Sequence, residues 1–549
     1  MKKIFIAAIM FIFTLGLYGV TINNEFVNKI VYEILSDNKS LSIDSIGDNL
    51  KTNEIIVQVK LDYEDFNEVS KSDIENQDKY REEAKSYYEN LNEKYLSSIN
   101  LSNYKSVYIS KYTPYIEFVY TDDKYYENES RISYSINRND NIEVAYIKDT
   151  IVQKTGQMKS AMKIAGAAEQ YQNGYYSGSG IKVGILEPGL VDPEASCFRY
   201  NQVTNHIQNT PLESIDEHTT HMAAYIGGSD GIASDVKIYS SYIWGTPTEE
   251  LDWLLDNGVN IINMSYGDAN PTGYYESDSA YCDMIVGNYK ITMVGAVGNY
   301  GNGSRLVANP ALAYNVIGVG AGNDCGYPES YSSYIEYSGG PKPTILAEGS
   351  GVSLSEPGYY NSGTSVSCAI VSGLIALLME EFSVLKTRPE LVMSALVSGA
   401  YQNPGAILGP NGFTNSGGAG LVRYDVFRTN MTSYLYMQTS LGVLQTFIYS
   451  KTMFLSSNEI FKVCLAWNAY TNGTVESLNI TNYDLYLYDE AGNVCATSLS
   501  TDSNIELLQY FIPNDGEYTI KIKQVTFIAR YNEKIALTWG IMPDPISYY

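Results

Sequence analysis

The segment Asn361–Phe382, NSGTSVSCAIVSGLIALLMEEF, places a serine at the start of a long apolar run. Leu374, Leu377 and Leu378 recur at the three- and four-residue spacing of a helix, so the segment predicts a buried helix. Two interpretations of Ser365 follow. It caps the helix by accepting a backbone N–H, or it is a nucleophile beside the positive end of the helix dipole. The segment alone favours the cap, and the rest of the chain reverses that preference.

The composition is that of a large folded protein with an excess of acidic residues. The chain has 549 residues, of which 44% are hydrophobic, and its formal net charge is −26. This charge argues against binding to nucleic acid or to anionic membranes. Residues 1–20 carry two lysines and then an apolar stretch that is shorter than a membrane span. They predict a signal peptide or a retained N-terminal anchor, and hence an exported bacterial protein that is secreted or held in the cell envelope.

The cysteines argue against a zinc ribbon, because no CxxC pair occurs. Export makes disulfides compatible with the sequence. Cys464 and Cys495 form the most natural pair, since both fall in the C-terminal region, but the sequence leaves the pairing open.

Residues 21–155 predict a small α+β unit. NEIIVQVKLDY (53–63) has the pattern of a strand, and SVYISKYTPYIEFVYT (106–121) that of one or two more. Between them, residues 72–99 have the pattern of a charged amphipathic helix. A unit of this kind directly after an export signal is typical of a pro-region; an independent adhesive domain is the alternative.

Residues 156–430 have less charge and more glycine and serine, and short apolar strands alternate there with helical patterns. Such strands suit a parallel sheet covered by helices on both faces, with ligands bound at the carboxyl ends of the strands. The predicted strands are IKVGILEPG (181–189), VKIYSSYIW (236–244), VNIINMSYG (259–267), ITMVGAVGN (291–299) and YNVIGVGAG (314–322).

Residues 431–549 alternate apolar and polar positions in short strands, such as NYDLYLYDEAGNV (482–494), where DEAGN makes a hairpin turn. This pattern predicts a C-terminal β-sandwich, of which the jelly roll is the favoured type.

Four polar groups in the middle region belong to one kind of chemistry. Glu187 ends an apolar strand, His218 begins a helix of small residues, Asn299 ends another strand, and Ser365 begins the buried helix. Acid, imidazole, amide and hydroxyl are the groups that acyl transfer by a serine nucleophile requires. Their order along the chain, acid then histidine then serine, is that of the subtilisin architecture.

The middle region resembles the subtilisin-like serine peptidases, or subtilases, over residues 150–430. VGILEPG is similar to the family's strand with the catalytic acid, HTTHMAA to its histidine helix, and GTSVSCAIVSG to its serine motif. The resemblance implies an α/β fold with a subtilisin-like parallel sheet flanked by helices. It also implies that Glu187 orients the imidazole, His218 is the general base, Asn299 is the oxyanion donor and Ser365 is the nucleophile.

The resemblance further implies where and how substrates bind. The residues that would line the primary specificity pocket and pair with the substrate backbone are Ser265, Tyr266, Gly267, Ala296, Val297 and Gly298. Protein or peptide substrates are expected, with the pro-region (21–155) as an intramolecular inhibitor. The chemistry needs no cofactor and no catalytic metal, and structural calcium is compatible with the family.

Several positions depart from the family pattern. Glu187 stands where the family has aspartate, Thr219 where it has glycine, Glu348 where it often has proline, and Ala369 where it usually has proline. Two hypotheses are therefore kept. The favoured one is a secreted serine endopeptidase made as a zymogen; the alternative is a pseudoprotease that serves as a binding or regulatory module.

A metal site at the two histidines is disfavoured. His218 and His221 follow Glu217, but the HExxH spacing is absent and no third ligand is evident. His221 is better interpreted as a structural histidine.

Overall fold

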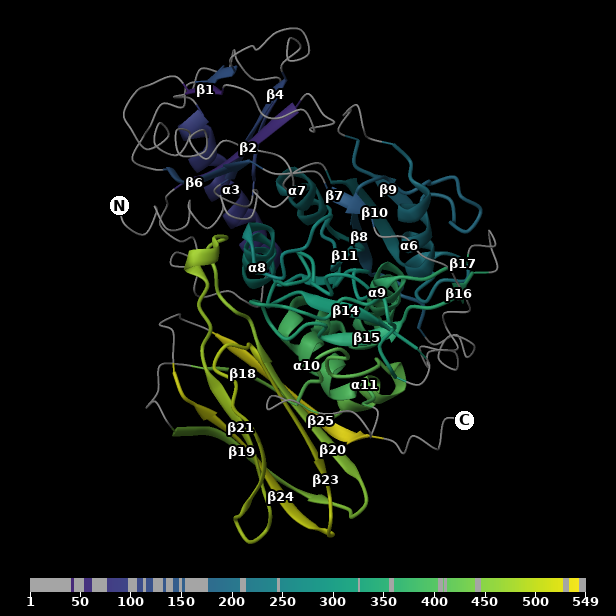
Figure 1. Ribbon diagram of the computed structural model, residues 1–549, viewed down its shortest axis with the longest axis vertical. Helices are drawn as coiled ribbons and strands as arrows, with labels where there is room; N and C mark the ends of the chain where they lie inside the picture. The colour runs from purple at the N-terminus through teal and green to yellow at the C-terminus, as the bar shows by residue number, and fades with distance from the viewer. Residues whose placement is uncertain are drawn as a thin grey trace. The chain divides into compact units, whose positions relative to one another are not determined.

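The computed structural model (Figure 1) describes seventeen stretches of the chain: residues 41–43, 54–61, 77–96, 106–111, 115–121, 132–134, 142–147, 151–153, 176–207, 214–243, 247–323, 326–354, 360–402, 408, 412–439, 446–526 and 533–542. The predicted signal peptide (1–20) lies outside the described residues. The chain divides into two compact units: Met1–Asp149 with Gly245–Asp252, and Thr150–Trp244 with Trp253–Tyr549.

The first unit contains a four-stranded antiparallel sheet in the order β3-β4-β2-β6 and one long helix. Its helix, α3, contacts β3, and its strands β2, β3 and β4 fall within the segments predicted from the sequence. A buried carboxylate attaches residues 245–252 to this unit, because Asp252 accepts hydrogen bonds from the hydroxyls of Tyr108 (2.7 Å) and Ser110 (3.2 Å) and from the backbone of Lys111 (2.5 Å). The elements are β1 (Leu41–Ile43), β2 (Glu54–Leu61), α3 (Gln77–Leu96), β3 (Ser106–Ile109), β4 (Tyr115–Thr121), β5 (Ile132–Tyr134) and β6 (Ile142–Ile147).

The second unit begins with an α/β domain built on a seven-stranded parallel sheet, in the order β15-β14-β13-β11-β8-β10-β9. The predicted parallel sheet is confirmed. Its strands are β8 (Lys182–Glu187), β9 (Val203–Asn205), β10 (Lys237–Tyr242), β11 (Ile261–Met264), β13 (Thr292–Ala296), β14 (Ile317–Gly322) and β15 (Ile345–Glu348). Four short strands lie outside this sheet in two pairs: β12 (Tyr266–Asp268) pairs with β7 (Ile151–Gln153), and β16 (Val352–Ser353) pairs with β17 (Tyr360–Asn361).

The chain reverses its direction of travel across the sheet at β8. It moves from β8 to β10 on one side, then crosses back to β11 on the other and continues to β13, β14 and β15. Parallel sheets bind ligands at the carboxyl ends of the strands beside such a reversal. The residues at the ends of β8 and β11 are therefore the ones that this topology presents for function.

Helices cover the sheet, and the longest of them, α9, contacts β11, β13, β14 and β15 and also α6. Among the described residues, α9 is the one helix long and apolar enough to cross a membrane, and 89% of its apolar window is buried inside the protein. The helices of this domain are α6 (Glu217–Gly227), α8 (Ser277–Tyr289), α9 (Thr364–Glu381), the 3-10 turn Ser383–Thr387, α10 (Pro389–Gly399) and α11 (Tyr424–Asn430), whereas α7 (Thr248–Asp256) is divided between the two units.

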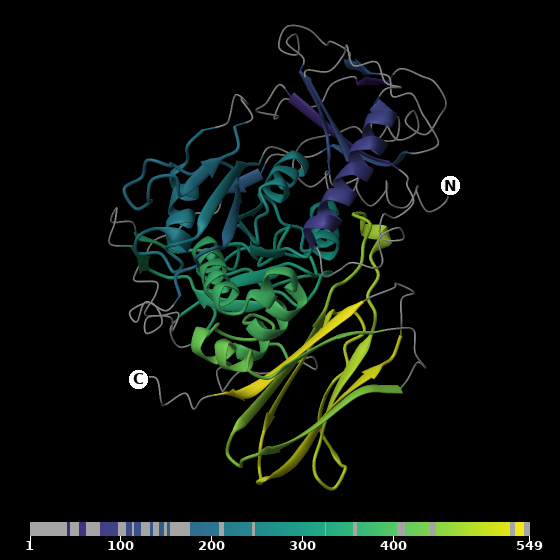
Figure 2. The same ribbon diagram turned by 180° about the vertical axis from the view of Figure 1, so that it is seen from behind.

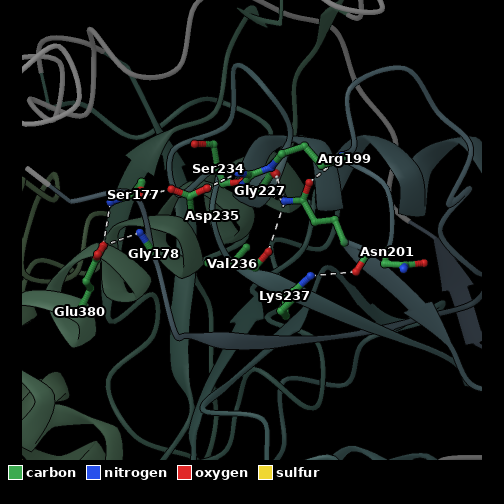
Figure 3. A network of polar contacts seen from close by, with 11 residues as sticks. Ser177, Gly178, Arg199, Asn201, Gly227, Ser234, Asp235, Val236, Lys237 and Glu380 are labelled. Carbon is green, nitrogen blue, oxygen red and sulfur yellow. Dashed lines mark hydrogen bonds and ion pairs between the residues drawn. The ribbon is translucent and has the colours of Figure 1, made fainter. Parts of the chain in front are cut away.

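The stretch before β8 is held by a network of polar contacts, shown in Figure 3. Glu380, near the end of α9, accepts hydrogen bonds from the backbone N–H groups of Ser177 and Gly178, both at 2.7 Å. Asp235 accepts a hydrogen bond from the Ser177 hydroxyl and pairs with Arg199. The first strand of the sheet is thus anchored from within the α/β domain.

The C-terminal part is a β-sandwich of two four-stranded antiparallel sheets, which are well seen in Figure 2. The sheet orders are β18-β25-β20-β23 and β19-β24-β21-β22, so consecutive strands alternate between the sheets except for the β21–β22 hairpin, which is the jelly-roll pattern. The predicted sandwich of jelly-roll type is confirmed. Its elements are β18 (Tyr434–Gln438), β19 (Thr446–Leu455), β20 (Ile460–Trp467), the 3-10 turn Val475–Ser477, β21 (Tyr483–Tyr488), β22 (Val494–Ser498), β23 (Ile505–Phe511), β24 (Gly516–Gln524) and β25 (Lys534–Met542).

The sandwich shares its hydrophobic core with the α/β domain. Along β20, Val463 and Leu465 belong to the core between the two sheets, whereas Cys464 and Ala466 belong to the core that includes α9 and α10. Both faces of this strand are covered, so it is buried almost throughout.

The predicted pairing of Cys464 with Cys495 is wrong. Cys464 and Cys495 are both free thiols. The two residues lie on strands of different sheets, and Cys464 faces the core shared with α10, whereas Cys495 packs at the edge of the core between the sheets.

A buried lysine joins the two domains. Lys462 on β20 is fully buried, and its Nζ donates to the carbonyl oxygens of Ala400 (2.5 Å) and Ala419 (2.8 Å) in the α/β domain. Ala400 caps the C-terminal end of α10, where the helix dipole favours a positive charge. Burial nevertheless lowers the pKa of Lys462 from 10.5 to about 7, because the charged form loses its water.

This shift predicts a pH dependence of stability. Between pH 7 and 10.5 the unfolded chain binds a proton at Lys462 that the folded chain has released, so this lysine makes folding more favourable as the pH rises. We expect Lys462→Met to reduce the rise in urea-unfolding midpoint between pH 7 and pH 10. Lys451→Met, at an exposed position on β19, is the matched control and should leave the rise unchanged. Equal pH profiles for wild type and Lys462→Met would contradict the expectation.

Candidate active site

A buried carboxylate stands at the carboxyl end of β8. Glu187 is fully buried, and its Oε1 accepts a hydrogen bond from the backbone N–H of Ser265 at 3.0 Å. Its Oε2 lies 3.6 Å from Nδ1 of His218, whose side chain is 10% exposed. A buried carboxylate is tolerated where polar groups compensate its desolvation, and here a backbone N–H and an imidazole lie against it. The structure brings together the acid and the imidazole that the sequence predicts as partners.

The turn after β8 fixes the start of α6. The backbone N–H of Asp216 donates to the carbonyl of Leu190 at 2.9 Å, and Asp216 then caps the helix by accepting from the backbone N–H of Thr219 at 2.8 Å. A Cβ atom on Gly189 would lie 2.3 Å from that of Asp216, so this close approach requires glycine. The segment that follows the acid therefore also positions His218, the second residue of α6.

Ser365 is the second residue of α9 and is 2% exposed. Its hydroxyl donates to the carbonyl of Ser265 at 3.1 Å, and the Ser265 hydroxyl donates in return to the carbonyl of Ser365, also at 3.1 Å. The capping position belongs to Gly363, whose φ of 146° a side chain would rarely adopt. The interpretation of Ser365 as an N-cap is therefore wrong.

Asn299 presents an amide donor beside Ser365. Its Oδ1 accepts hydrogen bonds from the backbone N–H (2.9 Å) and the hydroxyl (3.0 Å) of Thr364, the residue before Ser365. Its Nδ2 has no partner among the residues that the structure describes. A Cβ atom on Gly363 would approach this Nδ2 to 3.3 Å. An oriented amide N–H with no other described partner, close to the start of the helix that carries Ser365, suits an oxyanion donor.

The predicted substrate-lining residues fall on two segments that follow neighbouring strands of the sheet. Ser265, Tyr266 and Gly267 follow β11, and Ala296, Val297 and Gly298 end and follow β13. The backbone of β12 pairs antiparallel with β7 of the same chain, with Tyr266 opposite Gln153 and Gly267 opposite Val152. A strand from the N-terminal part of the chain thus occupies the edge on which the sequence analysis expects substrate backbone.

Two polar residues that the sequence analysis did not single out support these groups. Thr364 orients Asn299, and Asn263 supports Ser265 by donating a hydrogen bond to its hydroxyl at 2.9 Å. Asn263 in turn accepts from the hydroxyl of Ser372 (3.0 Å) and the thiol of Cys368 (3.2 Å), both on α9. The sequence carried a signal for Asn263, since it and Asn260 are the two polar residues of the otherwise apolar run VNIINM.

His221 behaves as a structural residue. It is 7% exposed, its Nε2 lies 3.6 Å from Oε1 of Glu217, and burial lowers its pKa below the usual 6.5. Over the described stretches, no group of three or more His, Cys, Asp or Glu residues is arranged to hold a metal ion.

Three departures from the family pattern are accommodated locally. Thr219 is fully buried, and its hydroxyl donates to the Asp216 carboxylate at 3.0 Å, so the side chain strengthens the helix cap. Glu348 ends β15, and its carbonyl accepts from the Ser367 hydroxyl at 3.2 Å. Ala369 is buried inside α9, where alanine is a favourable helix former.

A model of the subtilase family matches residues 114–420, more than half of the chain. The chain belongs to the subtilase family. Its members are serine peptidases, and the α/β domain with its parallel sheet has the fold that the family implies.

Individual relatives cover only parts of the chain. Subtilisin DY from Bacillus licheniformis is 28% identical over 243 residues, which make up 40% of this chain and 83% of that protein. Subtilisin-like protease SBT6.1 from Arabidopsis thaliana is 26% identical over 281 residues, 46% of this chain and 26% of that protein, so the chain spans about a quarter of its length. Among solved structures, the prenylagaramide maturation protease PagA is 24% identical, with a TM-score of 0.40, and the match covers 48% of this chain and 98% of that one.

The contact between Thr364 and Asn299 gives a testable prediction. Thr364→Val removes the hydroxyl that fixes Asn299 Oδ1 but keeps the shape of the side chain and the backbone N–H. We expect kcat for peptide hydrolysis to fall by roughly tenfold, less than the about 10²–10³ that loss of a whole oxyanion donor costs. Thr364→Ser keeps the hydroxyl and is the control, and Asn299→Ala sets the lower limit. An unchanged kcat in Thr364→Val beside a large loss in Asn299→Ala would refute the orienting role.

Proposed function

We propose that this protein is an exported serine endopeptidase, made as a zymogen, that hydrolyses peptide bonds of protein substrates through an acyl-enzyme on Ser365. The observation that carries the proposal is the convergence on Ser265. Its N–H binds Glu187, its carbonyl binds the hydroxyl of Ser365, and its own hydroxyl binds the Ser365 carbonyl. The side chains of the acid and of the nucleophile are thereby both hydrogen-bonded to the backbone of Ser265.

In the proposed mechanism, the Ser365 hydroxyl rotates from the Ser265 carbonyl toward His218, which takes its proton as Oγ attacks the scissile carbonyl carbon. Glu187 holds the imidazole by Nδ1 and stabilises its positive charge. Asn299 Nδ2 and the Ser365 N–H donate to the oxyanion. His218 then protonates the leaving amine, and a water molecule activated by the same histidine releases the acyl group.

Glu187 supports this mechanism if its carboxylate moves slightly. The 3.6 Å between Oε2 and Nδ1 exceeds a hydrogen bond of at most about 3.2 Å, so an approach of roughly 0.4 Å is required. The hydrogen bond from Ser265 keeps Oε1 in place while the longer side chain allows this adjustment.

Two distances are also consistent with the alternative, a pseudoprotease with binding or regulatory function: that between Glu187 Oε2 and His218 Nδ1, and that between the Ser365 hydroxyl and the Ser265 carbonyl. In that case the carboxylate does not close on His218, and the Ser365 hydroxyl stays on the Ser265 carbonyl.

Fluorophosphonate labelling of the purified protein separates the two hypotheses. We expect wild type to be labelled and Ser365→Ala to remain unlabelled.

Glu187→Gln keeps the size of the side chain but removes the charge that stabilises the imidazolium. It should therefore slow peptide hydrolysis by up to about 10⁴, the cost of the corresponding change in another serine protease.

One outcome would favour the pseudoprotease hypothesis over the enzyme hypothesis. It is a folded wild type that stays unlabelled while Glu187→Asp, which restores the family's aspartate, is labelled. Thermal unfolding of each variant checks that a missing label does not reflect a missing fold.

The pairing of β7 with β12 supports the zymogen part of the proposal. The strands are antiparallel, with Ile151 opposite Asp268 and Gln153 opposite Tyr266, so β7 runs toward Ser265 and Ser365. This register sets Gln153, the last described residue of β7, opposite Tyr266, the residue directly after Ser265. The contacts of Ser177 and Gly178 with Glu380 lie beyond this point and survive a cut there.

We therefore expect self-processing at the bond directly after residue 154. N-terminal sequencing of the mature protein should begin at Thr155, and Ser365→Ala should stay full length. A mature end several residues away would show that the β7–β12 register is not the one cleaved, and cleavage in Ser365→Ala would show that another protease makes the cut.

A further inference from the structure

Tyr300 connects the oxyanion donor to the substrate edge. It follows Asn299 directly, and its hydroxyl is shared between the carbonyl oxygens of Asp268 (3.1 Å) and Ala269 (2.9 Å). Asp268 is the last residue of β12, the strand whose outer edge pairs with β7. One side chain therefore spans from the segment that carries Asn299 to the segment on which substrate backbone is proposed to lie.

The short segment of Asn299 and Tyr300 is held at three points. Thr364 binds Oδ1 of Asn299, and the Ser333 hydroxyl accepts from the backbone N–H of Tyr300 at 3.1 Å. The third point is the Tyr300 hydroxyl on the end of β12. The first two fix the segment to α9 and to the loop that contains Ser333, and the third makes its position depend on β12.

We propose that Tyr300 is a positioning residue that couples occupation of the β12 edge by an extended substrate to the placement of the Asn299 oxyanion donor. The inference rests on the proposed peptidase function. A strand that pairs with Tyr266 and Gly267 orders the backbone of β12 through its carboxyl end. The Tyr300 hydroxyl passes this ordering to the residue next to Asn299. Because catalysis is sensitive to displacements of about 1 Å, a small gain in order raises kcat for long substrates.

The structure also indicates that the test variant will fold. The Asp268 carboxylate accepts hydrogen bonds from the backbone (3.0 Å) and side-chain (3.1 Å) N–H groups of Asn309, and the Asp268 N–H donates to the Asn309 carbonyl at 3.2 Å. β12 therefore remains attached to the α/β domain when the Tyr300 hydroxyl is removed. Phenylalanine keeps the ring and its packing.

The experiment compares Tyr300→Phe with wild type on two substrates. The first is a peptide amide with four residues before the scissile bond, long enough to pair with β12. The second is p-nitrophenyl acetate, a small ester with no peptide backbone to pair. We expect kcat on the long peptide to fall about five- to tenfold, the usual effect of one neutral hydrogen bond, with KM nearly unchanged. Turnover of the ester should stay within a factor of two.

Tyr274→Phe is the matched control. Tyr274 is an exposed tyrosine whose ring packs against Tyr337, with the centroids 5.1 Å apart, and it should leave both rates unchanged. Equal losses on both substrates in Tyr300→Phe would overturn the coupling, since the residue would then merely support the local fold. A change in KM alone would also overturn it. A wild type that turns over neither substrate would instead refute the proposed peptidase function, and the coupling would fall with it.

Discussion

The arrangement of the candidate site depends on the backbone of Ser265. Ser265 directly follows β11, whose carboxyl end lies beside that of β8. Its N–H therefore donates to the Glu187 carboxylate, and its carbonyl accepts from the Ser365 hydroxyl. Both contacts use backbone groups, which a substitution of the side chain does not remove. Asn263 donates to the Ser265 hydroxyl and accepts from the Ser372 hydroxyl, and so links this segment to α9.

The parallel sheet makes this meeting of groups possible. The chain reverses its direction of travel beside β8, and the carboxyl ends of β8 and β11 therefore lie side by side at one edge of the sheet. α6 and α9 contact each other, and both begin near this end of the sheet, bringing His218 and Ser365 to it by their first turns. Four groups that are distant in sequence are thus placed by the ends of two strands and two helices.

The jelly roll is an integral part of the second unit. Its β20 contributes side chains to two hydrophobic cores, and Lys462 extends from it to the end of α10. Ser394 on α10 adds a hydrogen bond from its hydroxyl to the Cys464 carbonyl at 2.7 Å. These contacts support a stabilising role for the jelly roll.

Local pattern predicted much of the fold and the identity of the candidate residues. Periodicities of two and about 3.6 residues predicted the strands and the α9 helix, because burial of one face imposes them. The order acid, histidine, serine predicted the fold family. Interpretation failed where the answer depended on a partner distant in sequence. The pairing of Cys464 with Cys495, which the sequence favoured but left open, does not form, because the two residues lie on strands of different sheets and face different cores.

The sequence by itself determined which chemical groups the protein carries, since residue types and their local spacing need no three-dimensional information. Only the tertiary structure decided how those groups meet. It set the 3.6 Å between Glu187 and His218, the direction of the Asn299 amide and the link from Tyr300 to β12. Each of these depends on the packing of elements far apart along the chain, and such distances are fixed by the whole core and not by any segment within it.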